Sequence, residues 1–512
     1  MQLSFFNKYK HKIKSKEDLK KIINKNKSKK FIVCHGVFDI VHPGHVRHLI
    51  HAKNHADILI VSLTKDKFIK KGKNRPHVPE NLRCLNMSAF EMVDYVLLDN
   101  EKTPINLIKY LKPNYFAKGF EYSSTNINQN TIKEEKTVSK YGGKMIFTPG
   151  DIVYSSTKVL KNFSPKIEIE KTLSLMESHN ISFEYLKKTI KNFKKFKLHV
   201  IGDIIIDGYT ETHLSGSKNK TPTFSVIRDS VKNYIGGAGV VASHVKATGA
   251  NVTLTTLVGK DKFKNFIETE FKKNNIDLNL IVDDTRPTTY KNVFIANNYK
   301  LLKVDDVNND PISNTITKKF QEEIKKTKSD AIIFSDFRHG IFNKSNIKLF
   351  TKSIDKKIFK VADSQVASRW GNISDFINFD LITPNEYEAR FSVAEQDCSL
   401  NELAILLQKK THYKNLILKL GSSGVFCSSR NNHKYFVLNS FVNDLIDPVG
   451  AGDALCAYST LGFLSSKSLA VAALIGSFAA ACECEYNGNK PIKAEDVITR
   501  IESYEKNANF KK

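Results

Sequence analysis

Short hydrophobic runs alternate with amphipathic stretches over the first third of the chain. Residues 15–28 have the spacing of an amphipathic helix that begins at a serine cap, and residues 43–56 that of a helix with proline in its first turn. Buried strands, some preceded by a helix, are predicted in KFIVCHGVFDI (30–40), DILIVSLT (57–64), LNMSAFEMVDYVLL (85–98), TPINLIKYLKPNYFAKG (103–119) and GGKMIFTPG (142–150). This alternation predicts a parallel, doubly wound α/β sheet over about residues 30–160.

A second series of strands and helices begins at KLHVIGDIIIDGY (197–209) and continues to the C-terminus. Residues 292–307 alternate like an antiparallel hairpin, which we expect in a small β lid. Further strands are predicted in VTLTTLVG (252–259), DAIIFSDF (330–337), FKVADSQ (359–365), FDLITPNE (379–386) and NLILKLGSSGVF (415–426). The predicted organisation is an α/β domain over residues 1–160, a lysine-rich helical linker over 161–195 and a second α/β domain over 196–512.

Length and composition agree with a multidomain globular protein. A chain of 512 residues is too long for one hydrophobic core, and 41% hydrophobic with 26% charged residues is ordinary for a soluble protein. Apolar runs stay below the ~18 residues of a membrane span, and the first residues lack the features of a secretory signal. We therefore expect a cytoplasmic protein that does not bind membranes.

The net charge of +26 comes from 69 lysines against 10 arginines, spread along the whole chain. A nucleic-acid surface is usually clustered and richer in arginine, so a general bias toward lysine explains the charge better. We expect no nucleic-acid partner. The positive field favours phosphorylated small molecules as substrates.

The stretch HPGHVRHLIH places His42, His45, His48 and His51 three residues apart. Each step of three residues turns a helix by 300°, so His42 and His45 share a face while His51 lies opposite His42. The four side chains cannot converge on one metal ion. The N-terminus of a helix binds phosphate through its free N–H groups, and two imidazoles there can donate to phosphoryl oxygens. His48 and His51 are expected to be surface or packing residues.

The segment GVFDIVHPGH (36–45) resembles the HxGH nucleotidylyltransferase superfamily. KKGKNRPHVPENLR (70–83), YFAKGFEY (115–122) and YSSTKVL (154–160) resemble its sugar-phosphate branch, especially the nucleotidylyltransferase half of bifunctional ADP-heptose synthases. The resemblance implies that His42 and His45 stabilise the α-phosphate in the transition state. The other residues that it implies in nucleotide or phosphate binding are Gly36, Phe38, Asp39, Lys71, Arg75, Arg83, Lys118, Ser155, Ser156 and Thr157.

The segment DPVGAGDAL (447–455) opens a predicted helix with small residues, so that backbone N–H groups can approach a transferring phosphoryl group. Asp453 in its first turn could accept a proton from a substrate hydroxyl. Companion segments are GDIIIDGY (202–209), GGAGVVASHVKATGA (236–250), SDFRHG (335–340), TPNEYEA (383–389) and KLGSSGV (419–425). Together they resemble the ribokinase-like pfkB sugar kinases over residues 197–505, and most of all the kinase half of the same synthases.

This resemblance implies an ATP-dependent kinase whose Mg²⁺ arrives with the nucleotide rather than at a separate protein metal site. Asp453 would be the catalytic base. The other implied residues are Asp207, Gly236 and Gly237 for the sugar, Asn385 and Glu388 for the Mg²⁺-phosphates, Lys419 and Gly421 for the nucleotide, and Gly450, Ala451 and Gly452 for the phosphoryl group.

The chain departs from the family pattern in three ways. Val240 replaces an asparagine that commonly helps to hold the sugar, and Asp363-Ser364-Gln365 stands where the heptose kinases have Asp-Pro-Lys. The nucleotidylyltransferase half comes first here, whereas the kinase half comes first in the usual fusion.

The sequence therefore predicts a bifunctional enzyme of nucleotide-sugar synthesis, acting for example in making the lipopolysaccharide core. The kinase half would phosphorylate a sugar phosphate, a heptose 7-phosphate, at C1. The other half would join the sugar 1-phosphate to a nucleotide, from ATP to give ADP-heptose, and release pyrophosphate. Two alternatives stay open: a cytidylyltransferase acting on a polyol phosphate beside a kinase of other specificity, or a kinase half that is no longer catalytic. Lids of this fold often pair, so the resemblance also implies a homodimer.

Overall fold

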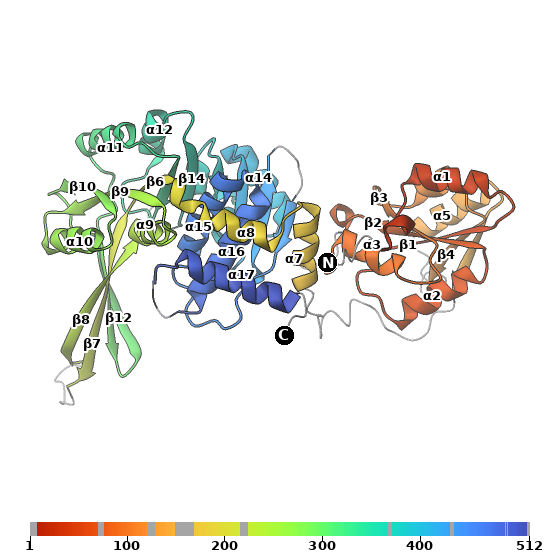
Figure 1. Cartoon of the computed structure of the whole chain (residues 1–512), viewed down its shortest axis with the longest axis horizontal. Helices are drawn as coiled ribbons and strands as arrows, with labels where there is room; N and C mark the ends of the chain where they lie inside the picture. Colours follow the sequence, from red (N-terminus) through yellow and green to blue (C-terminus); the bar gives the residue numbers. More distant parts are fainter. Residues whose placement is uncertain are drawn as a thin grey trace. The chain divides into compact units, whose positions relative to one another are not determined.

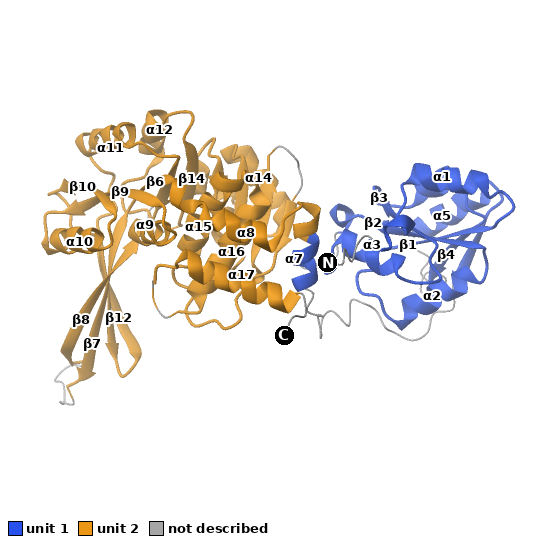
Figure 2. Cartoon of the chain, viewed as in Figure 1, with its two compact units in different colours: residues 1–174 blue, residues 175–512 orange. Residues whose placement is uncertain are grey.

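The structure is a computed structural model that describes residues 8–69, 76–119, 129–148, 168–215, 224–366, 371–430, 435–486, 488 and 490–508. The chain divides into two compact units, residues 1–174 and 175–512 (Figure 2). The mixed α/β architecture expected for each part is confirmed. The predicted boundaries at residues 160 and 196 stay a prediction.

The first unit is built on a five-stranded parallel sheet in the order β3-β2-β1-β4-β5 (Figure 1). Its strands are β1 (Phe31–Gly36), β2 (Ile58–Thr64), β3 (Tyr95–Asp99), β4 (Tyr115–Gly119) and β5 (Lys144–Thr148). Its helices are α1 (Lys16–Lys25), α2 (Pro43–Lys53), α3 (Glu80–Ser88), α4 (Ile105–Leu111) and α5 (Gln129–Ser139). Hydrophobic clusters cover both faces of the sheet, so β2 is buried along its whole length.

The strand order of this sheet reverses direction between β1 and β4, because β2 and β3 lie on one side of β1 and β4 and β5 on the other. Ligands of open α/β sheets bind at the carboxyl ends of the strands where the order reverses. The loop that follows β1 and leads into α2 begins at this point. The predicted histidine pair therefore lies where the topology favours a ligand.

The second unit contains a nine-stranded sheet in the order β10-β9-β6-β13-β14-β15-β16-β17-β18, parallel from β10 to β16. Its strands are β6 (Lys197–Gly202), β9 (Asn251–Gly259), β10 (Asp277–Asp283), β13 (Ala331–Asp336), β14 (Phe359–Ser364), β15 (Leu381–Ile382), β16 (Asn415–Lys419), β17 (Val425–Ser429) and β18 (Tyr435–Leu438). The single strand expected over residues 415–426 is wrong. A short turn at Gly421–Ser423 divides the segment, and β17 returns antiparallel to β16.

A second, four-stranded sheet forms the lid, in the order β12-β11-β7-β8. It contains β7 (Ile204–Leu214), β8 (Val226–Gly237), β11 (Tyr290–Ala296) and β12 (Tyr299–Asp306), and its strands project from the α/β body (Figure 1). The antiparallel pairing of β11 with β12 confirms the predicted hairpin. The segment KLHVIGDIIIDGY crosses between the two sheets, since β6 ends at Gly202 and β7 begins at Ile204.

Helices pack around the large sheet of the second unit. Two of them, α15 and α16, are buried over most of their length. Helix α8 packs against α15, α16 and α17, so this part of the expected linker lies within the second unit. The helices from residue 168 onward are α7 (Glu168–Ser178), α8 (Phe183–Lys191), α9 (Ala238–Ala247), α10 (Lys262–Lys273), α11 (Asn314–Lys326), α12 (Lys344–Ser353), α13 (Glu386–Val393), α14 (Leu400–Thr411), α15 (Ala451–Ser466), α16 (Leu469–Cys484) and α17 (Ala494–Ala508). Among the described residues, no helix is both long and apolar enough to cross a membrane.

Candidate active sites

The histidine pair of the first unit lies at the N-terminus of α2. His42 is the N-cap residue, and its carbonyl accepts the backbone N–H groups of His45 and Val46 at 2.9 and 3.2 Å. The imidazole rings of His42 and His45 stack with their centroids 3.8 Å apart. Burial, together with the neighbouring His42 and His48, lowers the pKa of His45 to about 4. The pair is thus held together at a helix terminus with His45 neutral at physiological pH.

The loop between β1 and α2 is tight and well anchored. Phe38 has a left-handed backbone conformation (φ 48°), and its ring lies 5.1 Å from the His45 ring, centroid to centroid. Asp39 is buried, and its Oδ1 accepts the backbone N–H of Val78 at 2.7 Å. Gly36 lies at the end of β1 directly against the Phe38 ring. Phe38 therefore lies beside the histidine pair, with Gly36 next to Phe38, and the predicted roles of these two residues and Asp39 stay predictions.

Arg83 differs from a substrate-facing arginine because its side chain is fully buried. Its guanidinium donates to the carbonyl oxygens of Val78, Val37 and Thr64 at 3.0, 2.6 and 2.8 Å, and to Asp66 Oδ1 at 2.5 Å. These contacts join the β1–α2 loop to the end of β2. In this structure Arg83 positions the loop, and its predicted contact with a phosphate stays a prediction.

Lys118 lies at the end of β4, the strand next to β1. Its ammonium pairs with Glu134 and lies 3.1 Å from Thr131 Oγ1, both on α5. His35, which the motif alone does not single out, contacts Ser62 Oγ at 2.9 Å, and burial with the nearby Lys118 lowers its pKa to about 4. The remaining predicted residues of this half, Lys71, Arg75, Ser155, Ser156 and Thr157, lie outside the described residues.

The second unit has a glycine-rich turn at the start of α15. Gly450 is the N-cap residue with φ 85°, a conformation that favours glycine, and it accepts the N–H groups of Asp453 and Ala454 at 3.0 Å. Ala451 and Gly452 form the first turn of the helix. The backbone of this turn is therefore open to a phosphoryl group, with Asp453 beside it.

Lys419, at the end of β16, places a positive charge beside the glycine turn of α15. Its ammonium lies 2.8 and 3.2 Å from the two carboxylate oxygens of Asp363, and a side chain at Gly452 would meet it at 3.3 Å. Burial acts to lower the pKa of Lys419, but the carboxylates of Asp363 and Glu388 outweigh it and raise that pKa. The lysine is therefore a permanent cation between carboxylates.

Asp453 shares this buried cluster. Burial raises its pKa to about 7, the carboxylates of Asp363 and Glu388 also act to raise it, and Lys419 opposes them. A carboxyl group with this pKa exchanges a proton near neutral pH, as a general base must.

Asn385 and Glu388 cap α13 at the edge of the same cluster. Asn385 Oδ1 accepts the N–H of Glu388 at 2.8 Å, and Glu388 Oε2 accepts the N–H of Asn385 at 2.7 Å. Burial raises the pKa of Glu388 to about 7. Gly421 follows Lys419 in an open turn. The structure thus brings Asn385, Glu388, Lys419 and the start of α15 together, while their roles in binding stay predictions.

The predicted sugar-binding residues lie where the lid meets the body. Asp207 is on β7, paired with Tyr234 on β8. Gly236 leaves room for the Asp207 carboxylate, because a side chain at this position would force that carboxylate to move. Gly237 is the N-cap residue of α9, and Val240, the departure from the family pattern, is buried within that helix.

The other departure, Ser364, belongs to a buried polar network. Ser364 Oγ donates to Asp336 Oδ2 at 2.8 Å and accepts from Arg338 at 3.0 Å. Arg338 has φ 65° and also pairs with Asp336 at 3.0 Å. A proline at position 364 could form neither bond of the hydroxyl. These two hydrogen bonds therefore give a structural reason for serine at position 364.

Comparison with known families agrees with this geometry. The sequence profile of the pfkB family carbohydrate kinases matches residues 195–494, well over half of the chain. The chain belongs to the pfkB family. A second profile, described as cytidylyltransferase-like, matches residues 33–162, ahead of the pfkB domain. The predicted fold class and the order of the two domains are confirmed.

Curated relatives carry the name Bifunctional protein HldE. The protein from Campylobacter concisus is 36% identical over 144 residues, which is 28% of this chain and 30% of the relative. The protein from Helicobacter acinonychis is 27% identical over 312 residues, which is 59% of this chain and 65% of the relative. The chain thus spans less than two thirds of the length of these relatives.

Among solved structures, the pfkB half resembles phosphofructokinase-2 from Escherichia coli, solved in complex with potassium. The TM-score is 0.51 at 14% identity, covering 60% of this chain and 99% of that one. At this identity the similarity concerns the fold alone, and it confirms the ribokinase-like architecture of the second unit.

Asp363 is a residue of the pfkB half that the motifs alone do not assign to the site. It ends up in the cluster because β14 and β16 are both parallel strands whose carboxyl ends meet at one edge, although 56 residues separate Asp363 from Lys419. Asp363 follows a hydrophobic run at the end of a predicted strand. This position could have been used to assign it to the site, because ligands of parallel sheets bind at the carboxyl ends of the strands.

Proposed function

We propose that this chain is a bifunctional enzyme of nucleotide-sugar synthesis, with a sugar-phosphate kinase in the second unit and a nucleotidylyltransferase in the first. The observation that carries the proposal is the cluster of Asp453, Lys419, Asp363 and Glu388 at the glycine turn of α15. The name of the curated relatives, Bifunctional protein HldE, supports it.

In the kinase half, the ionised Asp453 takes the proton of the acceptor hydroxyl. The hydroxyl oxygen then forms a bond to the γ-phosphorus of ATP while the bond from that phosphorus to the bridging oxygen breaks, and ADP leaves. Lys419 and the N–H groups at the start of α15 stabilise the charge that moves onto the phosphoryl oxygens. We propose a heptose 7-phosphate as the acceptor and its C1 hydroxyl as the nucleophile.

Mg²⁺ fits this cluster. Asp363 and Glu388 are carboxylates beside the phosphoryl turn, and oxygen donors of this kind are what Mg²⁺ prefers. When bound with ATP, the metal neutralises phosphate charge. We assign Asp363 and Glu388 to hold it, directly or through water.

In the nucleotidylyltransferase half, a sugar 1-phosphate oxygen attacks the α-phosphorus of a nucleoside triphosphate, and pyrophosphate leaves. His42 and His45 donate to the α-phosphoryl oxygens at the N-terminus of α2. The nucleophile is already an anion, so positioning and charge stabilisation supply most of the catalysis. We propose ATP as the nucleotide and ADP-heptose as the product.

The test uses the purified full chain with ATP and a panel of sugar 7-phosphates, and identifies the products by mass. We expect a sugar bisphosphate from the kinase half. In a second reaction, a heptose 1-phosphate and each of the four nucleoside triphosphates are followed for pyrophosphate release. Release only with CTP and a polyol phosphate would replace this proposal by a polyol cytidylyltransferase. Absence of any phosphorylated product would support a kinase half that is no longer catalytic.

Small-molecule substrates, a cytoplasmic location and a homodimer complete the proposal. The pfkB fold and the pair of phosphate-binding helix termini support small phosphorylated substrates. The location and the dimer stay predictions from the sequence.

A further inference from the structure

One ammonium, that of Lys419, serves a cluster of three carboxylates at the glycine turn of α15. Burial raises the pKa of Asp453, and Asp363 and Glu388 add to this effect, so the three carboxylates lie in one cluster. The ammonium contacts both oxygens of Asp363, at 2.8 and 3.2 Å. The lysine is therefore committed to Asp363, which is also a carboxylate that we assign to Mg²⁺.

This ion pair leaves Asp363 little capacity for another ligand. A carboxylate has about four lone-pair positions in all. Asp363 Oδ1 accepts from Lys419 and, at 3.0 Å, from the hydroxyl of Thr383, while Oδ2 accepts from Lys419. A divalent cation that bound Oδ2 would share this oxygen with an ammonium. The Lys419 and Asp363 side chains are only 17% and 11% exposed, so the two cations would repel more strongly than at the surface.

The ammonium is also within reach of the phosphoryl turn. The backbone N–H of Lys419 donates to the carbonyl of Pro384 at 2.9 Å, and Asn385 forms an isolated parallel β-bridge with the lysine, so its backbone is fixed. A side chain at Gly452 would meet the ammonium at 3.3 Å. Rotation of the flexible lysine stem therefore suffices to carry the charge from Asp363 to a phosphoryl group at this turn.

The position of the lysine couples two ligands of the site. A nucleoside triphosphate alone meets the carboxylates of Asp363 and Glu388, which repel it, and a divalent cation alone meets the ammonium of Lys419. When both bind, the ammonium gains a phosphate partner and Asp363 gains a metal. The Lys419–Asp363 pair is then broken once for two ligands, which is a positive coupling between them.

We propose that Lys419 is an exchangeable counter-ion of the kinase site. Paired with Asp363, it opposes the separate binding of a divalent cation and of metal-free ATP, and it turns to the phosphate when the two bind together. The inference rests on the proposed kinase activity and adds the order of binding to it: the second unit takes up metal and nucleotide as one ligand.

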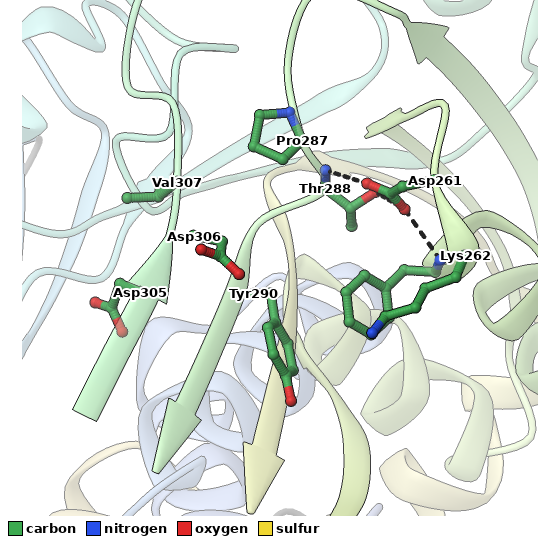
Figure 3. Close-up of a pocket in the computed structure, with 9 residues that line it drawn as sticks. Asp261, Lys262, Pro287, Thr288, Tyr290, Asp305, Asp306 and Val307 are labelled. Atoms are coloured by element: carbon green, nitrogen blue, oxygen red, sulfur yellow. Dashed lines mark hydrogen bonds between the residues drawn. The ribbon is translucent and has the colours of Figure 1, made fainter. Parts of the chain in front are cut away.

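A cavity of about 610 Å³ beside the lid supplies a matched control (Figure 3). It is lined by one lysine, Lys262, and by carboxylates that include Asp261. The Asp261 carboxylate accepts the N–H and the hydroxyl of Thr288 at 2.7 and 3.0 Å. The Lys262 ammonium lies over the Phe263 ring, 5.1 Å from its centroid. Lys262 is thus a lysine near carboxylates whose described contact is with a ring.

The first test measures metal binding to the full chain without nucleotide. The probe is Mn²⁺, which prefers oxygen ligands as Mg²⁺ does and whose free ion is measured by EPR. Lys419→Met should bind Mn²⁺ about 10- to 100-fold more tightly than the wild type, the factor of one charge-assisted hydrogen bond. Lys262→Met should keep the wild-type affinity. Adding Asp363→Asn to Lys419→Met should remove the gain, which would locate the ion at that carboxylate.

The second test measures nucleotide binding without metal, by calorimetry with a non-hydrolysable ATP analogue in EDTA. Asp363→Asn releases the ammonium of Lys419, so it should tighten binding of the metal-free analogue by about 10- to 100-fold. The double variant with Lys419→Met should lose this gain, because the released ammonium is absent. Each single substitution is thus expected to improve a binding step, which damage to the fold does not do.

Thermal unfolding identifies variants that have lost the fold, and if Lys419→Met is one of them the Asp363→Asn measurement decides. The proposal is overturned if a folded single variant binds its ligand no more tightly than the wild type. It is equally overturned if the wild type binds Mn²⁺ as tightly without the analogue as with it. Both gains without any phosphorylated sugar product would uphold the exchange and refute the kinase activity, whereas product without the gains would refute the exchange alone.

Discussion

The ammonium of Lys419 lies 2.8 Å from Asp363 Oδ1, and the same lysine approaches the glycine turn that carries Asp453. Because Lys419 lowers the pKa of Asp453 and Asp363 raises it, the two residues act on the base in opposite directions. Burial has the largest influence on the pKa of Asp453, and this pair then shifts that pKa in both directions.

We predict that Lys419→Met moves the acidic limb of the pH profile of kcat to higher pH, and that Asp363→Asn moves it to lower pH. Without the cation Asp453 keeps its proton longer, and without the neighbouring carboxylate it loses the proton sooner. Lys414→Met is the control, because the exposed Lys414 pairs with Asp380 and is not among the groups that act on the pKa of Asp453. Limbs that stay in place in both variants would contradict the assignment of Asp453.

Asp453→Asn should reduce ATP-dependent phosphorylation of the acceptor by about 10²- to 10⁴-fold, the range for loss of a general base. Nucleotidyl transfer by the same preparation should be unchanged, because its proposed residues belong to the other unit. Both rates can be followed in one sample by mass. Phosphorylation at the wild-type rate would exclude Asp453 as the base.

His45→Ala should cost about 10²- to 10³-fold in pyrophosphate release, since it removes a donor to the developing phosphoryl charge. His51→Ala on the same helix should cost far less, because the His51 ring lies against His55, with centroids 4.6 Å apart, and not against the stacked pair of His42 and His45. Equal losses in the two variants would mean that the histidines act through the stability of α2 and not at the phosphate.

Ser364→Ala should destabilise the second unit by about 1–3 kcal/mol, because it leaves Arg338 and Asp336 with one buried partner fewer. Urea unfolding measures the change, with the exposed Ser345→Ala as the control. A variant as stable as the wild type would show that the network does not depend on the hydroxyl.

Glu483 allows a prediction on the pH dependence of stability. It is fully buried at the end of α16, and burial raises its pKa to about 8, with Asp453 and Asp447 acting in the same direction. In the unfolded chain its pKa is about 4.3, so the folded protein binds more protons between these values and loses stability as the pH rises through them. Glu483→Gln should therefore gain stability relative to the wild type as the pH rises from about 5 to 8.

Urea unfolding at several pH values measures this difference, and the exposed Glu502→Gln on α17 serves as its control. A stability difference between Glu483→Gln and the wild type that stays constant with pH would mean that the buried carboxyl is ionised throughout.

Hydrophobic patterns along the chain were sufficient to predict helices and strands that bury a run or a regular alternation of apolar side chains. The parallel strands of the first unit and the β11–β12 hairpin are of this kind, and their positions were predicted closely. Strand β8 was not predicted, because most of its side chains are exposed and no apolar alternation marks it. Its pairing with β7, and not its own sequence, makes it a strand.

The candidate sites show the same division. Motif residues such as Gly450 and Asp453 lie together because they are neighbours in the chain, and they could be found from sequence alone. The contact between Asp363 and Lys419 depends on strand order, which no local pattern encodes. Arg83 shows that a motif residue can also have a different environment from the expected one. It lies within a predicted phosphate motif, but its guanidinium donates hydrogen bonds to backbone carbonyl oxygens of the protein.

The crossing from β6 to β7 at Gly202 has a mechanical consequence. Asp203 remains in the body, where its carboxylate accepts the N–H groups of Phe337 and His339 at 3.0 and 3.2 Å, and Asp207 is four positions further along, within the lid. The lid therefore joins the body through the strand that carries Asp207, the residue proposed to bind the acceptor. A molecule that engages Asp207 and Asp453 together must favour one lid angle over all others, so recognition and closure are a single equilibrium.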